Sequence, residues 1–187
     1  EAAEDETEEA VSPADDSWYE YHDLKFYWPN DYESRNQNFQ GTKHSHYGSD
    51  DDIIYTWTPC YNYASTSFCE NPNYTAKDVP EIVKLDVGEI IRQDFRIDTT
   101  YSEYIPETEE EKDVLGFDFI KQTGVLHDKE VDLRYAAYYG VIDLDDGKGV
   151  RTPIVWIAYS KADDDATKAE LERLVDTAAE TAILEKK

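Results

Sequence analysis

Alternating apolar and polar positions predict the first strands of the chain. The segment from Tyr21 to Trp28 (YHDLKFYW) places its large apolar side chains on one face, and the turn-forming sequence Pro-Asn-Asp follows it. The apolar positions on that face are Leu24, Phe26 and Trp28. Ile53 to Trp57 (IIYTW) also has the composition of a strand, which ends before Pro59.

A run of strands is predicted after Glu111. Val114 to Thr123, Val131 to Asp143 and Val150 to Ser160 are rich in aromatic and β-branched residues. In the second segment alternate residues share a face, which we expect to be the core side: Val131, Leu133, Tyr135, Ala137, Tyr139 and Val141. The sequence LDDGKG at 144–149 predicts a hairpin loop, so the second and third segments should pair antiparallel.

Apolar residues at helical spacing predict two helices. The first runs from Val79 to about Asp94, with Asp78 as N-cap and Glu81 completing a capping box. The second ends the chain and begins near Asp164 and Asp165, where acidic residues suit the helix dipole. Its apolar stripe is Leu171, Leu174, Val175, Ala178, Ala182 and Ile183.

Two further segments are predicted to be loops. Ser34 to Asp52 is polar and without period, which indicates a long surface excursion, and Phe95 to Pro106 should loop over the surface. Runs of strands with separated helices predict the α+β class, with helices packed on an antiparallel sheet. The length of 187 residues fits one such domain at 17–187 after a disordered acidic linker at 1–16.

The charge of the chain excludes two kinds of partner. Asp and Glu number 43 against 18 Lys and Arg, which gives a net charge of −25. Nucleic acids and anionic lipid surfaces require a basic protein surface, so we expect neither as a direct partner. The core is of ordinary size, because the chain holds 15 Tyr, 4 Trp and 6 Phe.

The leader from Glu1 to Asp16 contributes eight of the acidic residues and has too little apolar surface to fold. We expect it to be a spacer between an anchor and the domain; an acidic tail without that role is the alternative. It resembles the segment that follows the lipidated cysteine of mature bacterial lipoproteins. The chain has no Met, no signal sequence and no membrane-spanning run, so we expect a processed product whose anchor lay upstream.

Cys60 and Cys69 are the only cysteines and bracket a short polar and aromatic segment. Their spacing matches neither a metal site nor a thioredoxin-type pair. A structural disulfide would close a small loop and stabilise it by about 2 to 3 kcal/mol. We expect this disulfide, and with it an oxidising compartment; buried free thiols are the alternative.

Histidines and acidic clusters raise the question of metal binding. His44 and His46 could bind zinc, but no third ligand is placed by spacing, so solvated side chains are the preferred interpretation. Calcium could occupy the clusters at 50–52, 143–146 or 163–165, yet a hairpin turn and a helix cap explain two of the three without a metal. We expect no metal site and no cofactor.

The chain contains no motif for catalysis. A G-x-S-x-G elbow and a phosphate-binding glycine loop are both absent, and with 43 acidic residues a carboxylate pair cannot be chosen from sequence. The aromatic residues give a clearer signal, because they can stack on sugar rings or anchor a protein partner. Trp57, Tyr61 and Tyr63 are the candidate ligand-binding residues around the cysteine loop, although Trp57 also suits the core. A second aromatic group, Trp18, Tyr19 and Tyr21, stands at the domain start.

The sequence LKFYWPNDY resembles the opening of PsbP-like domains, an aliphatic and an aromatic residue before a proline and a further aromatic. The closing order of strand, acidic hairpin, strand ending in Ser160-Lys161 and amphipathic helix is similar to the end of that fold. The resemblance covers about Tyr21 to Leu184 and departs from the family at 34–52 and in the cysteine loop. It implies a three-layer α/β/α sandwich and a non-enzymatic role.

These observations together predict an extracytoplasmic binding or accessory domain of a bacterial surface lipoprotein. Its partner should be a protein or a glycan at the cell surface, with membrane attachment only through a lipid anchor and a monomeric state. Two alternatives remain open. One is a secreted glycoside hydrolase that uses two carboxylates, and the other is a structural subunit of a surface assembly.

Overall fold

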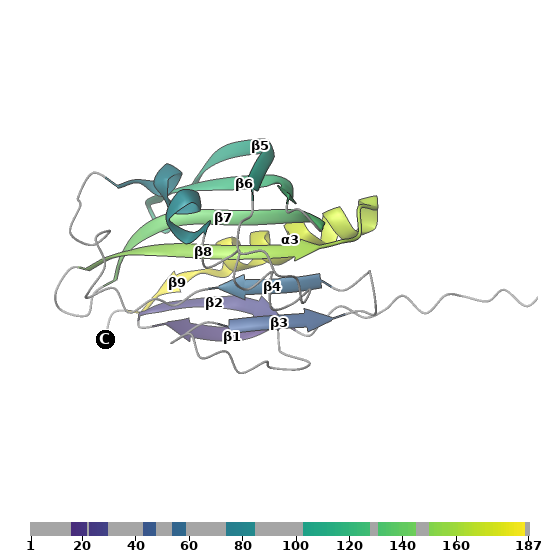
Figure 1. Ribbon diagram of the computed structural model, residues 1–187. Helices are drawn as coiled ribbons and strands as arrows, with labels where there is room; N and C mark the ends of the chain where they lie inside the picture. Colours follow the sequence, from purple (N-terminus) through teal and green to yellow (C-terminus); the bar gives the residue numbers. More distant parts are fainter. Residues whose placement is uncertain are drawn as a thin grey trace, which may run out of the picture.

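The computed structural model describes residues 16–21, 23–29, 43–47, 54–58, 74–84, 103–127, 131–144 and 150–185 (Figure 1). A three-stranded sheet has the order β1-β2-β9 and a six-stranded sheet the order β3-β4-β8-β7-β6-β5, with antiparallel neighbours throughout. The elements are β1 (Asp16–Tyr21), β2 (Leu24–Pro29), β3 (Lys43–Tyr47), β4 (Ile54–Thr58), η3 (Ala76–Asp78), β5 (Glu103–Val114), β6 (Phe117–His127), β7 (Asp132–Leu144), β8 (Val150–Ser160), α3 (Asp165–Thr181) and β9 (Ile183–Leu184).

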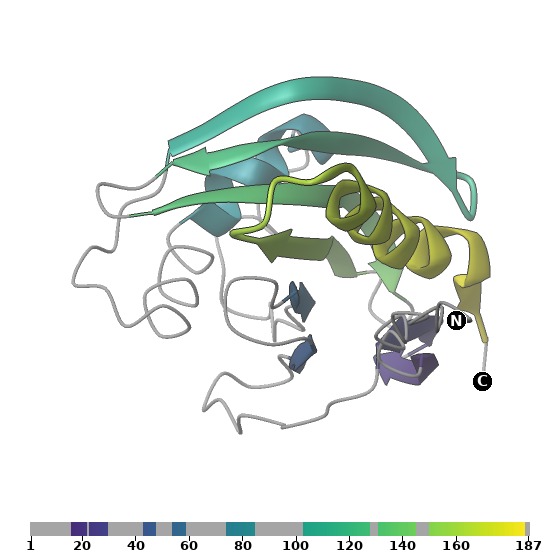
Figure 2. The same ribbon diagram turned by 90° about the vertical axis from the view of Figure 1, so that its right-hand side faces the viewer.

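The large sheet has helices on both faces. Helix α3 packs on β7 and β8 from one side, whereas η3 and the helical residues 79–84 that continue it contact β6 and β7 from the other. Figure 2 shows the two helices on opposite sides of these strands. The predicted α+β class, with antiparallel sheets packed against helices, is therefore confirmed.

Two hydrophobic clusters fill the spaces between these layers, because the strands β7 and β8 are buried on both faces. On the α3 side lie Phe119, Ala136, Tyr138, Ile142, Ile154, Trp156 and Ala158. On the η3 side lie Ile120, Leu126, Leu133, Tyr135, Ala137, Tyr139, Val141, Val155, Ile157 and Tyr159. The predicted core side of β7 is the η3 side. The other face of β7 is buried as well, because small residues alternate with larger ones there and let α3 pack closely on it.

The small sheet extends the core on the α3 side. The predicted inward face of β2 is confirmed, since Leu24, Phe26 and Trp28 are fully buried against α3 and Trp156. Strand β9 pairs with β2 through Leu24↔Leu184 and Lys25↔Ile183. The small sheet therefore combines the first two strands, β1 and β2, with the last strand, β9.

Strand β5 corrects the sequence interpretation of residues 103–123. Strand β5 begins at Glu103, within the segment predicted to be a loop up to Pro106, and the strand predicted from Val114 is interrupted by a turn at Leu115 and Gly116. Both turn residues have positive φ, of 57° and 82°, and glycine favours this conformation. The strand went unrecognised because most of its side chains are charged and lack an apolar face.

A second strand lies within the predicted surface excursion 34–52. Lys43–Tyr47 forms β3 and pairs antiparallel with β4. Prediction of a loop over this part is therefore wrong. The sequence KHSHY does alternate, but its alternate residues are histidines rather than apolar ones, so the alternation gave no strand signal.

The predicted C-terminal helix is confirmed as α3. Asp164 is its N-cap, with the Asp164 carboxylate accepting a hydrogen bond from the Thr167 backbone N–H at 2.8 Å. The stripe Leu171, Leu174, Val175 and Ala178 is buried. Ile183 is the exception, because the helix ends at Thr181 and Ile183 lies 40% exposed in β9.

The first predicted helix begins earlier than its sequence pattern indicated. A 3₁₀ turn, η3, precedes Val79, and the N-cap is Thr75 rather than Asp78. Asp78 takes the acidic position of the capping box and accepts a hydrogen bond from the Thr75 backbone N–H at 2.6 Å. Residues 85–94 of the predicted helix lie outside the described residues.

Candidate functional site

The predicted ligand-binding residues fall mainly outside the described part of the chain. Tyr61 and Tyr63 lie there, as do Cys60 and Cys69, so the disulfide and the aromatic loop stay predictions. Trp57 lies on β4, opposite His44 of β3 and Ile157 of β8. Its strand is thus internal to the large sheet, a position compatible with the core role considered for it.

Among the described residues, no group of three or more His, Cys, Asp or Glu side chains could hold a metal ion. The cluster at 163–165 has the structural role considered for it, because Asp164 caps α3 and Asp163 forms ion pairs with Arg134 and Lys168. The Arg134 guanidinium holds the pKa of Asp163 below its usual range. His44 and His46 lie on β3, while Asp50 to Asp52, Asp145 and Asp146 lie outside the described residues.

One hollow lies between η3 and the β5–β6 hairpin. It has a volume of about 340 Å³, which is at the lower end of small-molecule sites. We call it the η3 pocket. Its lining residues are Thr75, Ala76, Lys77, Glu111, Lys112, Asp118, Phe119 and Ile120.

The η3 pocket does not have the electrostatics of a hydrolase site. Its carboxylates belong to Glu111 and Asp118; the Glu111 side chain is 84% exposed and pairs with Lys77 at 3.5 Å, and Asp118 is also exposed. A carboxyl group that acts as a general acid needs an apolar setting that keeps it protonated. Neither carboxyl group of this pocket has such a setting.

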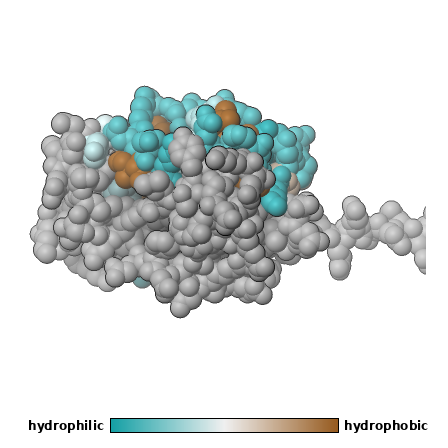
Figure 3. All heavy atoms as spheres, viewed as in Figure 1, coloured by the Kyte–Doolittle hydropathy of each residue, from teal (hydrophilic) through white to brown (hydrophobic). Residues whose placement is uncertain are grey.

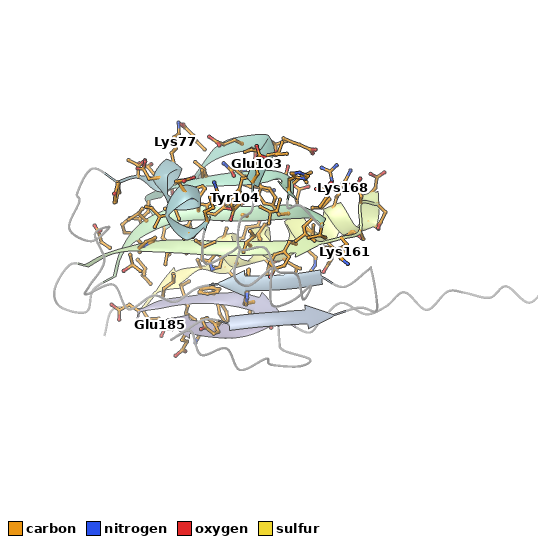
Figure 4. The ribbon with its side chains drawn as sticks, viewed as in Figure 1. Lys77, Glu103, Tyr104, Lys161, Lys168 and Glu185 are labelled. Carbon is orange, nitrogen blue, oxygen red and sulfur yellow. The ribbon has the colours of Figure 1, made fainter. Side chains whose placement is uncertain are left out.

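A second, smaller hollow of about 70 Å³ lies beside Arg134, near the start of α3. The Arg134 guanidinium donates to Asp163 and to Glu107 Oε1, the latter at 2.6 Å, and these bonds raise the Arg134 pKa. Figure 4 shows Lys168, which also lines this hollow, far from Lys77 of the η3 pocket. The ion pairs join β5, β7 and the start of α3, so a structural role accounts for Arg134.

The buried side chains of Tyr135 and Gln122, on the η3 side, have structural partners. The Tyr135 hydroxyl donates to Gln122 Oε1 at 3.1 Å, and the Gln122 amide donates to Glu109 Oε2 at 2.7 Å. Burial, together with the nearby Glu109 and Glu107 carboxylates, raises the pKa of Tyr135 above its usual value. Tyr135 therefore stays neutral and satisfies Gln122 rather than acting as a base.

The clearest candidate site is the solvent-facing side of the small sheet. We call it the outer face and define it by Trp18, Glu20, Lys25, Tyr27 and Ile183. These residues share one side because Trp18 pairs with Tyr27, Glu20 with Lys25, and Lys25 with Ile183 in the register of the strands. The opposite side of the same strands carries the buried residues of β2.

Trp18 dominates the outer face. Its side chain is 50% exposed, which is the largest exposure of any large apolar residue in the described ranges. The Tyr27 ring meets the indole edge-on, with 5.2 Å between the centroids, and the Lys25 ammonium lies 5.4 Å from the Trp18 centroid. These contacts hold the indole in place while half of it stays open to solvent.

Charged groups surround the aromatic pair. Lys25 Nζ lies 3.2 Å from Glu20 Oε1 and 3.9 Å from Glu185 Oε1. Figure 4 shows Glu185 beside the small sheet. An exposed ring flanked by a cation and carboxylates can stack on an apolar surface and also exchange hydrogen bonds with hydroxyl groups.

The sequence pointed to this region without separating its residues. Trp18, Tyr19 and Tyr21 were grouped as aromatics at the domain start, yet Tyr19 points the other way and packs on Phe26. The alternation along β1 would have separated these residues, because neighbouring residues of a strand, such as Trp18 and Tyr19, lie on opposite faces. To identify the exposed face of β1 one also needs its pairing with β2, because the inward side of β2 is apolar.

Comparison with known proteins gives little further identification. No protein-family model matches the chain, and no curated protein matches it. Among solved structures, the chain is similar to LpqN, a protein involved in cell envelope biogenesis of Mycobacterium tuberculosis. The sequences are 10% identical, the match covers 96% of this chain and 88% of LpqN, and the TM-score is 0.36. Within the described residues, no helix is long and apolar enough to cross a membrane.

Proposed function

We propose that this chain is a non-catalytic binding domain of a bacterial surface lipoprotein and that it contacts a glycan through the outer face. The observation that carries the proposal is the exposure of Trp18 beside Tyr27, between charged residues. Sugar rings have an apolar face that stacks on indole and a rim of hydroxyl groups. Lys25 can donate to such hydroxyls and Glu20 can accept from them.

The cellular setting belongs to the same proposal. The acidic leader at 1–16 and the two cysteines support an exported, oxidising location with attachment through a lipid upstream of the chain. Helices on both faces of an antiparallel sheet support the PsbP-like sandwich that the sequence resembles. We further propose that the domain is a monomer.

The alternatives have weaker support. A hydrolase needs a carboxyl group in an apolar setting, and both carboxyl groups of the η3 pocket are exposed. A subunit of a surface assembly needs a large apolar patch. In the described ranges the exposed large apolar residues are Trp18, Ile105, Leu115 and Ile183, which lie on two separate sheets or their turns.

The experiment is a glycan array probed with the whole chain, followed by calorimetric titration of the strongest hit. Trp18→Ala should weaken that binding at least tenfold, whereas Trp18→Phe, which keeps a ring, should retain most of it. Leu115→Ala is the matched control, because it removes another exposed apolar side chain, in the turn between β5 and β6 and away from the small sheet.

Three results would overturn the proposal. The array could show no bound glycan, the Trp18→Ala variant could bind like the wild type, or the bound glycan could be cleaved. The first result would move the assignment toward a protein partner. The third would establish a hydrolase.

A further inference from the structure

Strand β5 forms one margin of the six-stranded sheet. It pairs with β6 along one side only, and it stands last in the strand order. Figure 2 shows β5 as the teal strand along the outside of the sheet, with no further strand or helix of the described residues beyond it. Among the described residues no strand pairs with the outer side of β5, so its outward N–H and C=O groups can accept another strand.

The second half of β5 is suited to pairing. A register shift between Pro106 and Thr108 interrupts the first half, and proline there lacks a donor. From Thr108 to Val114 the pairing with β6 is continuous, with Thr108↔Thr123 at one end and Val114↔Phe117 at the other. This regular segment is the free edge, and it is not shielded by proline or a bulge.

The side chains of the free edge are open on both faces of the sheet. Of the residues from Thr108 to Val114 only Val114 is buried. The described atoms in this part of the surface are mainly hydrophilic in Figure 3. An incoming strand would therefore meet no covering helix on either side, so strand addition needs no rearrangement of the described core.

The negative charge of residues 108–114 determines which kind of strand can pair with this edge. The segment carries Glu109, Glu110, Glu111 and Asp113 against a single lysine, Lys112. A second copy of β5 would place like charges opposite one another, which disfavours self-pairing. A basic strand would instead gain favourable cross-strand pairs.

The two faces of the edge are unequal. Glu109, Glu111 and Asp113 alternate along one face, which is the side of Gln122 and the η3 pocket. The other face presents Thr108, Glu110 and Lys112, where Lys112 pairs with Glu110 at 3.3 Å and the Thr108 hydroxyl lies 2.5 Å from that of Thr123. Three carboxylates are thus concentrated on alternate residues of a single face.

We propose that the free edge of β5 binds an extended basic segment of a partner protein by strand addition, with lysine or arginine at every second position. Backbone hydrogen bonds to β5 supply the pairing, and the face of Glu109, Glu111 and Asp113 selects the basic residues. The existing partner of Glu111 does not prevent this. The Lys77 and Glu111 side chains are 62% and 84% exposed, and ion pairs with such exposure are weak.

The test uses the whole chain and a short peptide of alternating lysine and threonine as the probe. Binding is followed through backbone amide signals by nuclear magnetic resonance. We expect the largest changes at residues 108–114, and slower hydrogen exchange of their outward amides. A peptide of the same charge with N-methylated backbone positions should bind at least tenfold more weakly, because it cannot complete the ladder.

Adjacent residues of β5 provide matched variants. Glu111→Lys and Glu110→Lys change the charge equally but on opposite faces of the strand. Glu111→Lys should weaken peptide binding at least threefold more than Glu110→Lys does. Trp18→Ala should leave peptide binding unchanged, so the free edge and the outer face are tested independently.

Four outcomes would overturn the proposal. The lysine peptide could fail to bind at low salt, or its signals could map to the acidic leader instead of β5. The N-methylated peptide could bind as well as the parent, which would show attraction by charge alone. A peptide of alternating glutamate and threonine could bind equally well, which would remove the role of the acidic face.

Discussion

The Lys121 ammonium on β6 donates a hydrogen bond to Asp176 Oδ2 on α3 at 3.1 Å and so ties the outer half of the large sheet to its helix. The same ammonium lies 2.9 Å from Glu172 Oε1, and the Tyr138 hydroxyl donates to Asp176 Oδ1 at 2.7 Å. Lys121 is the least exposed of the three charged residues in this group, with 12% of its side chain accessible. The half-buried Asp176 carboxylate therefore links α3 to both β6 and β7.

Lys121→Met should lower the free energy of unfolding by about 1 to 2 kcal/mol, because Asp176 then loses its charged donor. Urea unfolding at pH 7 measures the change. Lys168→Met is the matched control and should cost less than about 0.5 kcal/mol, since its pair with Asp163 is exposed. Equal losses in the two variants would contradict the interpretation.

Gly140→Ala should destabilise the domain by about 1 to 3 kcal/mol, because a methyl group there forces the core to shift. A Cβ at this position would lie 2.4 Å from Phe119 Cδ1, and the Phe119 ring is stacked on Trp156. Phe119→Leu should relieve part of the clash. The double variant should therefore lose less stability than the sum of the single losses, and strict additivity would argue against the clash.

The domain should lose stability above about pH 10, where unfolded tyrosines ionise. Burial raises the pKa of Tyr138, which also donates to Asp176, and burial raises the pKa of Tyr139. A raised folded pKa means that the stabilisation is fully present below the unfolded value and is lost as the pH rises toward the folded one. Desolvation lowers the pKa of Lys121, but hydrogen bonds to Glu172 and Asp176 outweigh it, so its net shift is upward and acts in the same direction.

Urea unfolding between pH 8 and pH 11.5 checks this dependence. Each such tyrosine contributes a slope of up to about 1.4 kcal/mol per pH unit. Tyr138→Phe should have a flatter profile than the wild type over this range. A wild-type profile that stays level to pH 11.5 would contradict the assignment.

Asp164→Ala should lower the melting temperature at pH 7 through loss of the α3 cap. Hydrogen bonds from the Thr167 side chain and backbone lower the pKa of Asp164, so the stabilisation is present above the unfolded pKa and is lost as the pH falls through the folded one. The difference from wild type should therefore shrink as the pH falls and Asp164 becomes protonated. Asp165→Ala, which removes a neighbouring first-turn carboxylate, is the control and should change the melting temperature less.

Cys60 and Cys69 should form a disulfide. Titration of the unfolded chain with a thiol reagent should detect no free thiol until reductant is added. Reduction should also lower the thermal stability, since the closed loop restricts the unfolded state. Free thiols found before reduction would contradict the prediction.

Sequence patterns located the elements whose side chains differ between faces. Strand β2 and helix α3 were found because their buried residues follow periods of two and of 3.6. Strand β7 was found as well, but its second buried face was hidden, because Ala136 and Gly140 carry little apolar character of their own. Neighbouring aromatics from other elements make that face part of the core.

The rest depended on pairing between distant segments. Strands β3 and β5 carry mostly polar residues, and their backbones pair with β4 and β6. Ile183 continues the helical period of α3 but leaves the helix to pair with Lys25. The exposure of Trp18 also depends on pairing, because the register of β1 on β2 decides which face of β1 is open to solvent.

Helix α3 and strand β9 are the last described elements in sequence, but they pack on or pair with β2, which comes near the start. Ribosomes make the chain from its beginning, so β2 emerges long before the helix that covers Leu24, Phe26 and Trp28. Those side chains cannot be buried in their final environment until α3 and β9 have also left the ribosome. The core around β2 is therefore completed only after α3 and β9 have been synthesised, and truncation before β9 should leave the edge of β2 at Leu24 and Lys25 without its partner strand.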